Sequence, residues 1–159
     1  MAAIPLQRTA IAPEWVDYNG HLRDAYYWLL ISLASDALMD RLGLDAAYRQ
    51  RTACTLYTVE AHIHYLREVK RADVAEVGGR ILDSDAKRIH AGFELRCAGQ
   101  PEPAALAEVM LLHVHQGEPV TSHPFPAEVL AAIARAQDQT RGEPAPEPGS
   151  RRMSLPARR

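Results

Sequence analysis

The feature that most constrains the fold is one long apolar segment with helical periodicity at residues 22–42. Its apolar side chains recur at steps of three and four residues, which is the spacing of one face of an α-helix. Gly43 follows, where a glycine commonly ends a helix. Residues 25–34 are apolar on nearly every side, so we expect this helix to be buried rather than laid on a surface. The apolar positions are Leu22, Ala25, Tyr26, Leu29, Leu30, Leu33, Ala37, Leu38 and Leu42.

Long strands are expected to follow this helix in succession. Residues 55–66 alternate and are rich in β-branched and aromatic side chains, which is typical of a strand. Short turn segments separate this strand from three further ones. Those strands are predicted at residues 73–83, 87–97 and 104–115. A strand at residues 8–15 is expected to precede the helix, and a short helix is expected at residues 126–136, where Pro126 is tolerated in the first turn.

This order of elements favours the α+β class, with a curled antiparallel sheet wrapped around one long helix. It argues against a doubly wound parallel sheet, because helices do not alternate with the later strands. One domain is predicted over residues 1–138. Residues 139–159 are rich in proline, arginine and glutamate and nearly without apolar side chains, which predicts a disordered tail.

Composition excludes several classes of function. The chain has 159 residues, of which 47% are hydrophobic, enough for one domain with a core. A net charge of -2 gives no electrostatic case for nucleic acid or an acidic membrane. No apolar run approaches the ~20 residues that span a bilayer, and Pro5, Gln7 and Arg8 interrupt any signal peptide. Cys54 and Cys97 lack metal-type spacing, so we expect reduced thiols in a cytoplasmic protein.

The stretch Asp-Tyr-Asn-Gly-His at residues 17–21 stands directly before the apolar helix. Asn19 and Gly20 favour a sharp turn, and Gly20 tolerates a positive φ. A helix starting near His21 would aim unpaired amides at a carbonyl oxygen and stabilise an oxyanion. Asp17 could then activate water or attack directly, and His21 could orient it. Asp17 and Asn19 are equally well explained as helix caps. His21, taken alone, is more often a residue that bonds a backbone carbonyl.

Four segments resemble the hotdog-fold thioesterases of the 4-hydroxybenzoyl-CoA thioesterase-like superfamily. They are VDYNGHLRDAYY, SDALMDRLGLD, CTLYTVEAHIHYLREV and AEVMLLHV. The resemblance covers roughly residues 11–129. The D-x-N-G-H element is typical of the superfamily as a whole, whereas YTVEAHIHYLREV is similar to the betainyl-CoA thioesterases of bacterial carnitine degradation.

The resemblance implies a hotdog fold, homodimers that pair sheets edge to edge, and an active site between subunits. It implies that Asp17 is the base or the nucleophile, and that Asn19, Gly20 and His21 form the turn into the central helix. Relatives often carry a methionine or valine and then an asparagine after the Gly-His pair, whereas Leu22 and Arg23 stand here. Any role of that asparagine is absent or taken by Arg23.

Aromatic side chains gather around the Asp17 stretch and on the first long strand. A trimethylammonium group binds well to aromatic faces, at about 0.5–2 kcal/mol per contact. The resemblance to enzymes of betaine chemistry therefore favours a cationic acyl pocket, for which Trp15, Tyr18 and Tyr26 are the first choices. For any single ring, core packing is the more frequent explanation. The full set of expected substrate contacts is Trp15, Tyr18, Leu22, Tyr26, Tyr57 and Tyr65.

Two His-x-His pairs, His62 with His64 and His113 with His115, raise the question of a metal site. No carboxylate or thiol stands at a matching spacing, so we expect polar residues on a solvent-side or dimer-side strand face and no metal. Glu60 is the alternative catalytic acid, since it lies on the strand expected to cover the helix.

Coenzyme A carries phosphate groups, which basic side chains can bind through their opposite charge. Basic residues at such positions are more often solvent-exposed surface residues with no ligand. The basic residues in question form two groups, Arg67, Lys70 and Arg71 after one strand and Lys87 and Arg88 at the start of another.

We therefore expect a cytoplasmic, homo-oligomeric acyl-CoA thioesterase, a dimer or tetramer, that cleaves betainyl-CoA to glycine betaine and coenzyme A. No metal or bound cofactor is expected, and neither is a nucleic-acid or membrane partner. One alternative is a thioesterase for another short or aromatic acyl-CoA. The other is a non-catalytic hotdog module that binds acyl-CoA.

Overall fold

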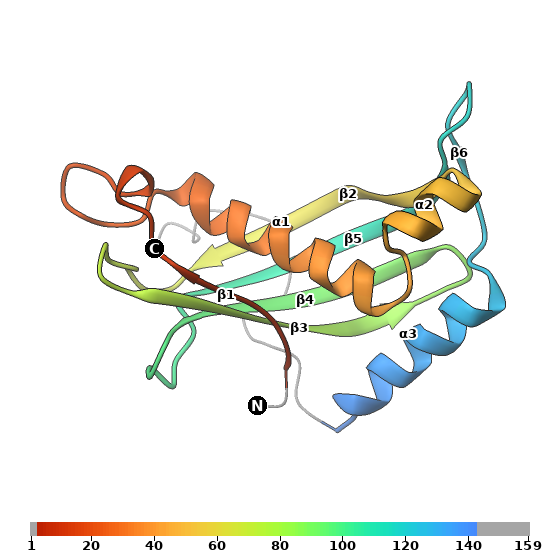
Figure 1. Ribbon diagram of the computed structural model, residues 1–159. Helices are drawn as coiled ribbons and strands as arrows, with labels where there is room; N and C mark the ends of the chain where they lie inside the picture. Colours follow the sequence, from red (N-terminus) through yellow and green to blue (C-terminus); the bar gives the residue numbers. More distant parts are fainter. Residues whose placement is uncertain (1–2, 143–159) are drawn as a thin grey trace, which may run out of the picture.

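The fold consists of a curved antiparallel sheet with one long helix across its concave face (Figure 1). The computed structural model describes residues 3–142. Its elements are β1 (Ile4–Ala10), the 3-10 helix η1 (Pro13–Trp15), α1 (Asp24–Arg41), α2 (Ala46–Thr52), β2 (Cys54–Tyr65), β3 (Val74–Ser84), β4 (Arg88–Cys97), β5 (Ala105–His115), β6 (Thr121–Ser122) and α3 (Ala127–Gln139).

The strands form one sheet in the order β1-β3-β4-β5-β2, with β6 paired to β5, and every pairing is antiparallel. The strand β2 is therefore an edge strand, and in the described part of the chain β5 is its only partner. This sheet around one helix is the hotdog arrangement that the resemblance implies, and the expected α+β class is confirmed.

The helix α1 supplies the centre of the core. Leu30, Ile31, Ala34 and Leu38 are fully buried, and they repeat at the helical spacing seen in the sequence. The helix contacts β1, β2, β3 and β4. Burying a leucine or isoleucine of this kind contributes about 1.5–3 kcal/mol. This stripe holds the sheet curled around the helix.

The expectation that the helix is buried rather than laid on a surface is met on one side of α1 only, in the single chain. Leu29 and Leu33 keep 38% of their surface exposed, on the side of α1 away from the core stripe. The sheet is one layer and covers one side of a helix only, so an all-round apolar helix leaves an open face.

The predicted long strands are confirmed to within one or two residues at each end. The strand expected at residues 8–15 is wrong at both ends. β1 spans Ile4–Ala10, and residues 13–15 form η1, with Pro13 in its first turn. The short helix α2, which the sequence reading did not include, starts where the Asp45 carboxylate accepts the amide of Tyr48 (2.8 Å).

The C-terminal helix α3 reaches Gln139, slightly beyond the predicted domain boundary at residue 138. Most of the predicted tail, residues 143–159, lies outside the described residues. No helix within residues 3–142 is long and apolar enough to cross a bilayer.

His113 is a core residue, contrary to the expected solvent-side or dimer-side strand face. Its side chain has 0% exposure and sits between Tyr48 of α2 and the segment after β5. Nδ1 lies 2.7 Å from the His123 carbonyl, which can only accept, so Nδ1 carries the hydrogen. Nε2 then accepts from the Tyr48 hydroxyl (2.9 Å). This tautomer ties α2 to the end of the sheet.

The neutral form of His113 is the one that this site holds, because burial lowers the pKa of His113 below its ordinary value of 6.5. Since the folded-state pKa is depressed, the stabilisation is complete above the unfolded-state pKa. It is lost as pH falls from there through the folded-state pKa. His113→Gln should therefore be less stable than wild type at pH 8 and should lose less stability between pH 7 and 5.

Urea unfolding at a series of pH values measures this difference. His115→Gln, two residues along β5 and not buried, is the matched control and should keep the wild-type pH slope. Tyr48→Phe should cost about 1–3 kcal/mol, because it leaves Nε2 without its donor. An unchanged pH slope in His113→Gln would contradict this assignment.

Candidate active site

Asp17 makes the hydrogen bonds that close a tight turn over residues 17–21. Its amide donates to the His21 carbonyl (2.8 Å), and its own carbonyl accepts from the Gly20 amide (3.0 Å). Its carboxylate Oδ1 accepts the amides of Asn19 (2.8 Å) and His21 (3.0 Å). Gly20 has a φ of 79°, a value that other residues adopt with strain. The predicted turn is therefore confirmed, and it presents the His21 ring at the N-terminal end of α1.

These hydrogen bonds also set the charge of Asp17. The hydrogen bond from the His21 amide has the largest influence and lowers the pKa of Asp17, against a smaller opposite effect of desolvation. Asp17 is therefore ionised at neutral pH, with one carboxylate oxygen committed to the turn.

The amides expected to bind an oxyanion are already engaged. Gly20 and His21 donate to Asp17, and the Leu22 amide donates to the Val69 carbonyl (2.7 Å). The helix itself begins at Asp24, with Arg23 as its N-cap. The expectation that the amides of residues 20–22 are free is therefore wrong, since the turn and a neighbouring loop use them first.

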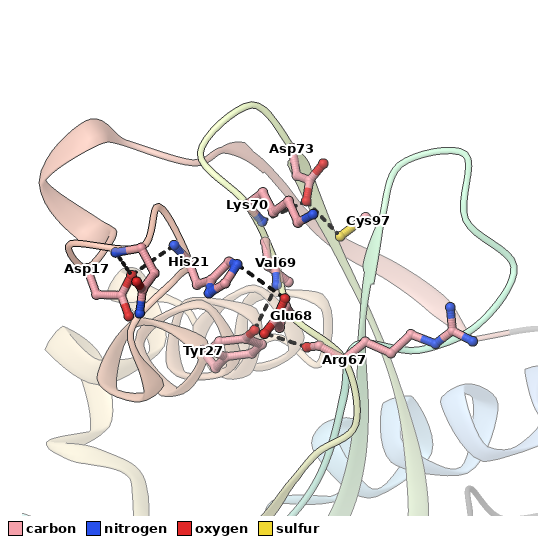
Figure 2. Close-up of polar contacts among 10 residues, drawn as sticks. Asp17, His21, Tyr27, Arg67, Glu68, Val69, Lys70, Asp73 and Cys97 are labelled. Atoms are coloured by element: carbon pink, nitrogen blue, oxygen red, sulfur yellow. Dashed lines mark hydrogen bonds and ion pairs between the residues drawn. The ribbon is translucent and has the colours of Figure 1, made fainter.

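The ring of His21 meets a carboxylate from a distant part of the sequence. His21 Nε2 lies 3.2 Å from Oε2 of Glu68, in the loop that follows β2. Figure 2 shows Asp17 on one side of His21 and Glu68 on the other. A backbone bridge between His21 and Lys70 holds the turn and the loop together. The sequence reading missed Glu68, although it lies within the YLREV segment that carried part of the resemblance.

Tyr27 fixes the loop that carries Glu68. Its hydroxyl donates to the Arg67 carbonyl (3.1 Å) and accepts the Val69 amide (3.0 Å), so it holds both peptide neighbours of Glu68. Burial raises the pKa of Tyr27, so the hydroxyl keeps its proton. Its ring meets the ring of Tyr65 edge to face, with centroids 5.3 Å apart.

These residues surround a pocket of about 380 Å³ at the N-terminal end of α1. Of the predicted site residues, His21, Leu22, Tyr65 and Arg67 line it. Asp24, Tyr27, Leu66 and Glu68 line it as well and were not among the predicted site residues. The pocket therefore combines an imidazole, two carboxylates and two aromatic rings.

The three aromatic residues that were the first choices for the acyl group do not line this pocket. Trp15 and Tyr26 stack on each other, with centroids 5.5 Å apart and an interplanar angle of 18°, and both pack against the core. Tyr18 is 94% exposed at the tip of the turn. Core packing, the more frequent explanation, holds for Trp15 and Tyr26.

Two residues of β2 also lie away from the pocket. Glu60 is exposed, and its carboxylate lies 3.1 Å from Nε2 of His62. On the neighbouring strand β5 it stands opposite Met110. Tyr57 lies toward the opposite end of β2, where Gln116 donates to its hydroxyl (3.4 Å). The structure thus does not bring Glu60 into the pocket as an alternative acid.

The basic residues divide into two groups at opposite ends of the sheet (Figure 1). The first group adjoins the pocket, because the Arg71 amide donates to Gly20 and Lys70 bridges to His21. The second follows the β3–β4 turn, where Arg88 pairs with Asp85 (2.5 Å) and Lys87 bonds Ser122 (3.0 Å). Only the first group lies where a ligand of the pocket could meet it.

Similarity to characterised proteins covers nearly the whole chain. The chain is 45% identical to the betainyl-CoA thioesterase of Pseudomonas aeruginosa, over 93% of its own length and 92% of that protein. It is 39% identical to the L-carnitine dehydrogenase/betainyl-CoA thioesterase of Rhizobium meliloti, over 79% of its own length and 25% of that longer protein.

Solved structures agree with these relatives. A candidate thioesterase from Pseudomonas putida superposes with a TM-score of 0.85 at 43% identity, over 99% of both chains. A Staphylococcus aureus protein solved in complex with CoA gives a TM-score of 0.89 at 28% identity, over 98% of both chains. The sequence profile of the Thioesterase-like superfamily matches residues 11–133. With that match, these relatives and this fold, the chain belongs to the Thioesterase-like superfamily and is an acyl-CoA thioester hydrolase.

Proposed function

We propose that this protein hydrolyses betainyl-CoA to glycine betaine and coenzyme A. The observation that carries the proposal is the His21–Glu68 pair at the pocket of a thioesterase-family fold. The relative from Pseudomonas aeruginosa, at 45% identity, supports the choice of acyl group.

In the proposed reaction, His21 is the base that activates water. Since Nε2 faces Glu68, it is the nitrogen that carries hydrogen, and Nδ1 is left to accept a proton. Water attacks the thioester carbon and gives its proton to His21, while Glu68 stabilises the imidazolium. The C–S bond then breaks, and the proton passes to the leaving sulfur. Water thus adds a hydroxyl to the acyl group and a hydrogen to the thiol.

Asp17 has a positioning role in this scheme. Its Oδ1 holds the amides of Asn19 and His21, and Asp17 does not line the pocket of the single chain. The earlier expectation that Asp17 itself activates water or attacks the thioester is the competing assignment. The two assignments differ in whether the charge of Asp17 or only its acceptor oxygen is needed.

Variants of the pair test the base. Glu68→Gln and His21→Gln should each lower kcat by about 100-fold or more, which is the contribution of general base catalysis. Release of the CoA thiol from betainyl-CoA measures the rate. Glu76→Gln is the control and should keep wild-type activity, because Glu76 is a half-buried residue of β3 that pairs with Arg8 (3.0 Å) outside the pocket.

Two variants of Asp17 belong to the same series and decide its role. Asp17→Asn keeps an acceptor oxygen for both amides, whereas Asp17→Ala removes it. We expect Asp17→Asn to retain clearly more activity than Asp17→Ala. If both variants are equally inactive while Glu68→Gln keeps its rate, Asp17 is the base or nucleophile and the assignment is reversed.

A panel of thioesters tests the acyl group. Betainyl-CoA should be cleaved with a kcat/KM at least about tenfold above that of butyryl-CoA or benzoyl-CoA. Equal rates on betainyl-CoA and butyryl-CoA would contradict the cationic pocket and favour a short-chain or aromatic thioesterase. A chain that binds acyl-CoA but releases no thiol from any of the three would be a binding module instead.

We further propose that the protein works as a homodimer through the open edge of β2. This edge is long and carries exposed apolar side chains, with Val59 and Tyr65 exposed by 55% and 50%. The open face of α1 adds Leu29 and Leu33. Exposed apolar strand edges are normally covered by a partner. Pairing there would place a second chain beside Tyr65 and hence beside the pocket.

A charge at this edge should separate the two copies. Val59→Lys is expected to shift the protein from dimer to monomer in light scattering coupled to size exclusion. Val120→Lys, a similarly exposed valine (49%) near β6, is the matched control and should leave the mass unchanged. A wild-type protein that elutes as a monomer at micromolar concentration would overturn the proposal.

The proposed reaction belongs to carnitine catabolism in the cytoplasm. The relative from Rhizobium meliloti joins L-carnitine dehydrogenase and betainyl-CoA thioesterase in one name. Cys54 and Cys97 are free thiols, as in a reducing compartment. As proposed, the reaction uses no metal, because His21 activates the water, and no bound cofactor, because coenzyme A arrives as part of the substrate. Lys70 and Arg71 are the basic residues proposed to meet its phosphates.

A further inference from the structure

The pocket beside α1 has a charge that does not suit the coenzyme. Coenzyme A is a polyanion, yet two carboxylates, Asp24 and Glu68, line this pocket. The one arginine in the lining, Arg67, forms an ion pair with Glu102. Figure 2 shows its guanidinium extending away from Tyr27 and Glu68. A negative pocket beside a negative coenzyme is favourable only when the group that enters it is positive.

The two carboxylates differ in their partners. Glu68 is paired with the ring of His21 (3.2 Å). Asp24 forms no ion pair with any residue in the described part of the chain, and its Oδ1 accepts the adjacent amide of Ala25 (2.8 Å). An acid in the first helical turn is favourable for the helix dipole. Asp24 is also one of the residues that line the pocket.

Tyr65 adds an aromatic wall next to Asp24. Its hydroxyl donates to the Asp24 carbonyl (3.4 Å), and its ring meets Tyr27 edge to face with an interplanar angle of 88°. Tyr65 therefore has a fixed place in the pocket, and half of its surface is open in the single chain. A carboxylate beside an aromatic face is the combination that recognises a quaternary ammonium, which has no N–H to donate.

We propose that Asp24 and Tyr65 bind the trimethylammonium end of the acyl group and thereby select cationic over neutral thioesters. This inference rests on the proposed function and names the residues that determine its specificity. In a betainyl group a single methylene separates the cation from the thioester carbonyl. The cation site must therefore share one pocket with the base, as Asp24 and Tyr65 do with His21.

The test compares betainyl-CoA with 3,3-dimethylbutyryl-CoA, in which carbon replaces the charged nitrogen and the shape is kept. Wild type should prefer betainyl-CoA. In Asp24→Asn the ratio of the two kcat/KM values should fall by about twofold to fivefold, the effect of one solvent-exposed charge pair. Asp36→Asn, an exposed aspartate further along α1, is the matched control and should keep the wild-type ratio.

Two further variants test the aromatic wall. Tyr65→Phe keeps the ring face and should keep most of the preference, whereas Tyr65→Leu should lose part of it. A wild type that cleaves both thioesters, with Asp24→Asn slowing both to the same extent, would overturn the cation site and leave the thioesterase intact. A wild type that cleaves neither thioester would remove the proposed function itself.

Discussion

The hydroxyl of Tyr27 is the contact on which the pocket depends. It joins the first turns of α1 to the loop after β2 by bonding the peptide groups on both sides of Glu68. The Leu22–Val69 backbone hydrogen bond (2.7 Å) and the His21–Lys70 bridge hold the same loop against the turn that presents His21. The hydroxyl adds the contacts that fix the two peptide groups next to the Glu68 carboxylate. This buried hydroxyl both donates and accepts a hydrogen bond. Together with the backbone contacts, it thus places His21 and Glu68, which are far apart in sequence, within 3.2 Å of each other.

The buried stripe of α1 gives this contact its rigid base. Because Leu30, Ile31, Ala34 and Leu38 fill the concave face of the sheet, α1 can neither slide nor rotate, and its N-terminal end stays beside the end of β2. The same geometry leaves the edge of β2 and one face of α1 open. The pocket therefore lies at the border of the apolar surface that we propose a second copy covers.

Much of the fold could be predicted because it follows from local periodicity. The helical spacing of residues 22–42 and the alternation of the later strands hold whatever their neighbours are, and both elements were found where expected. The turn at Asp17 was also predictable, since an Asn-Gly pair beside an acceptor carboxylate has few alternatives. His113 was not, because strand alternation does not show that α2 folds over one end of the sheet and buries it.

The amino-acid sequence alone was enough to specify the long helix, the long strands after it, the turn before α1 and the superfamily, because each rests on neighbours in the chain or on motif residues. The tertiary structure decided which side chains act together. It paired His21 with Glu68 and placed Asp24 and Tyr65 in one pocket, which Glu60, Trp15 and Tyr26 do not line. The physical reason is that strand register and long-range contacts between the turn and the loop after β2 set these distances, and neither can be read from residue spacing.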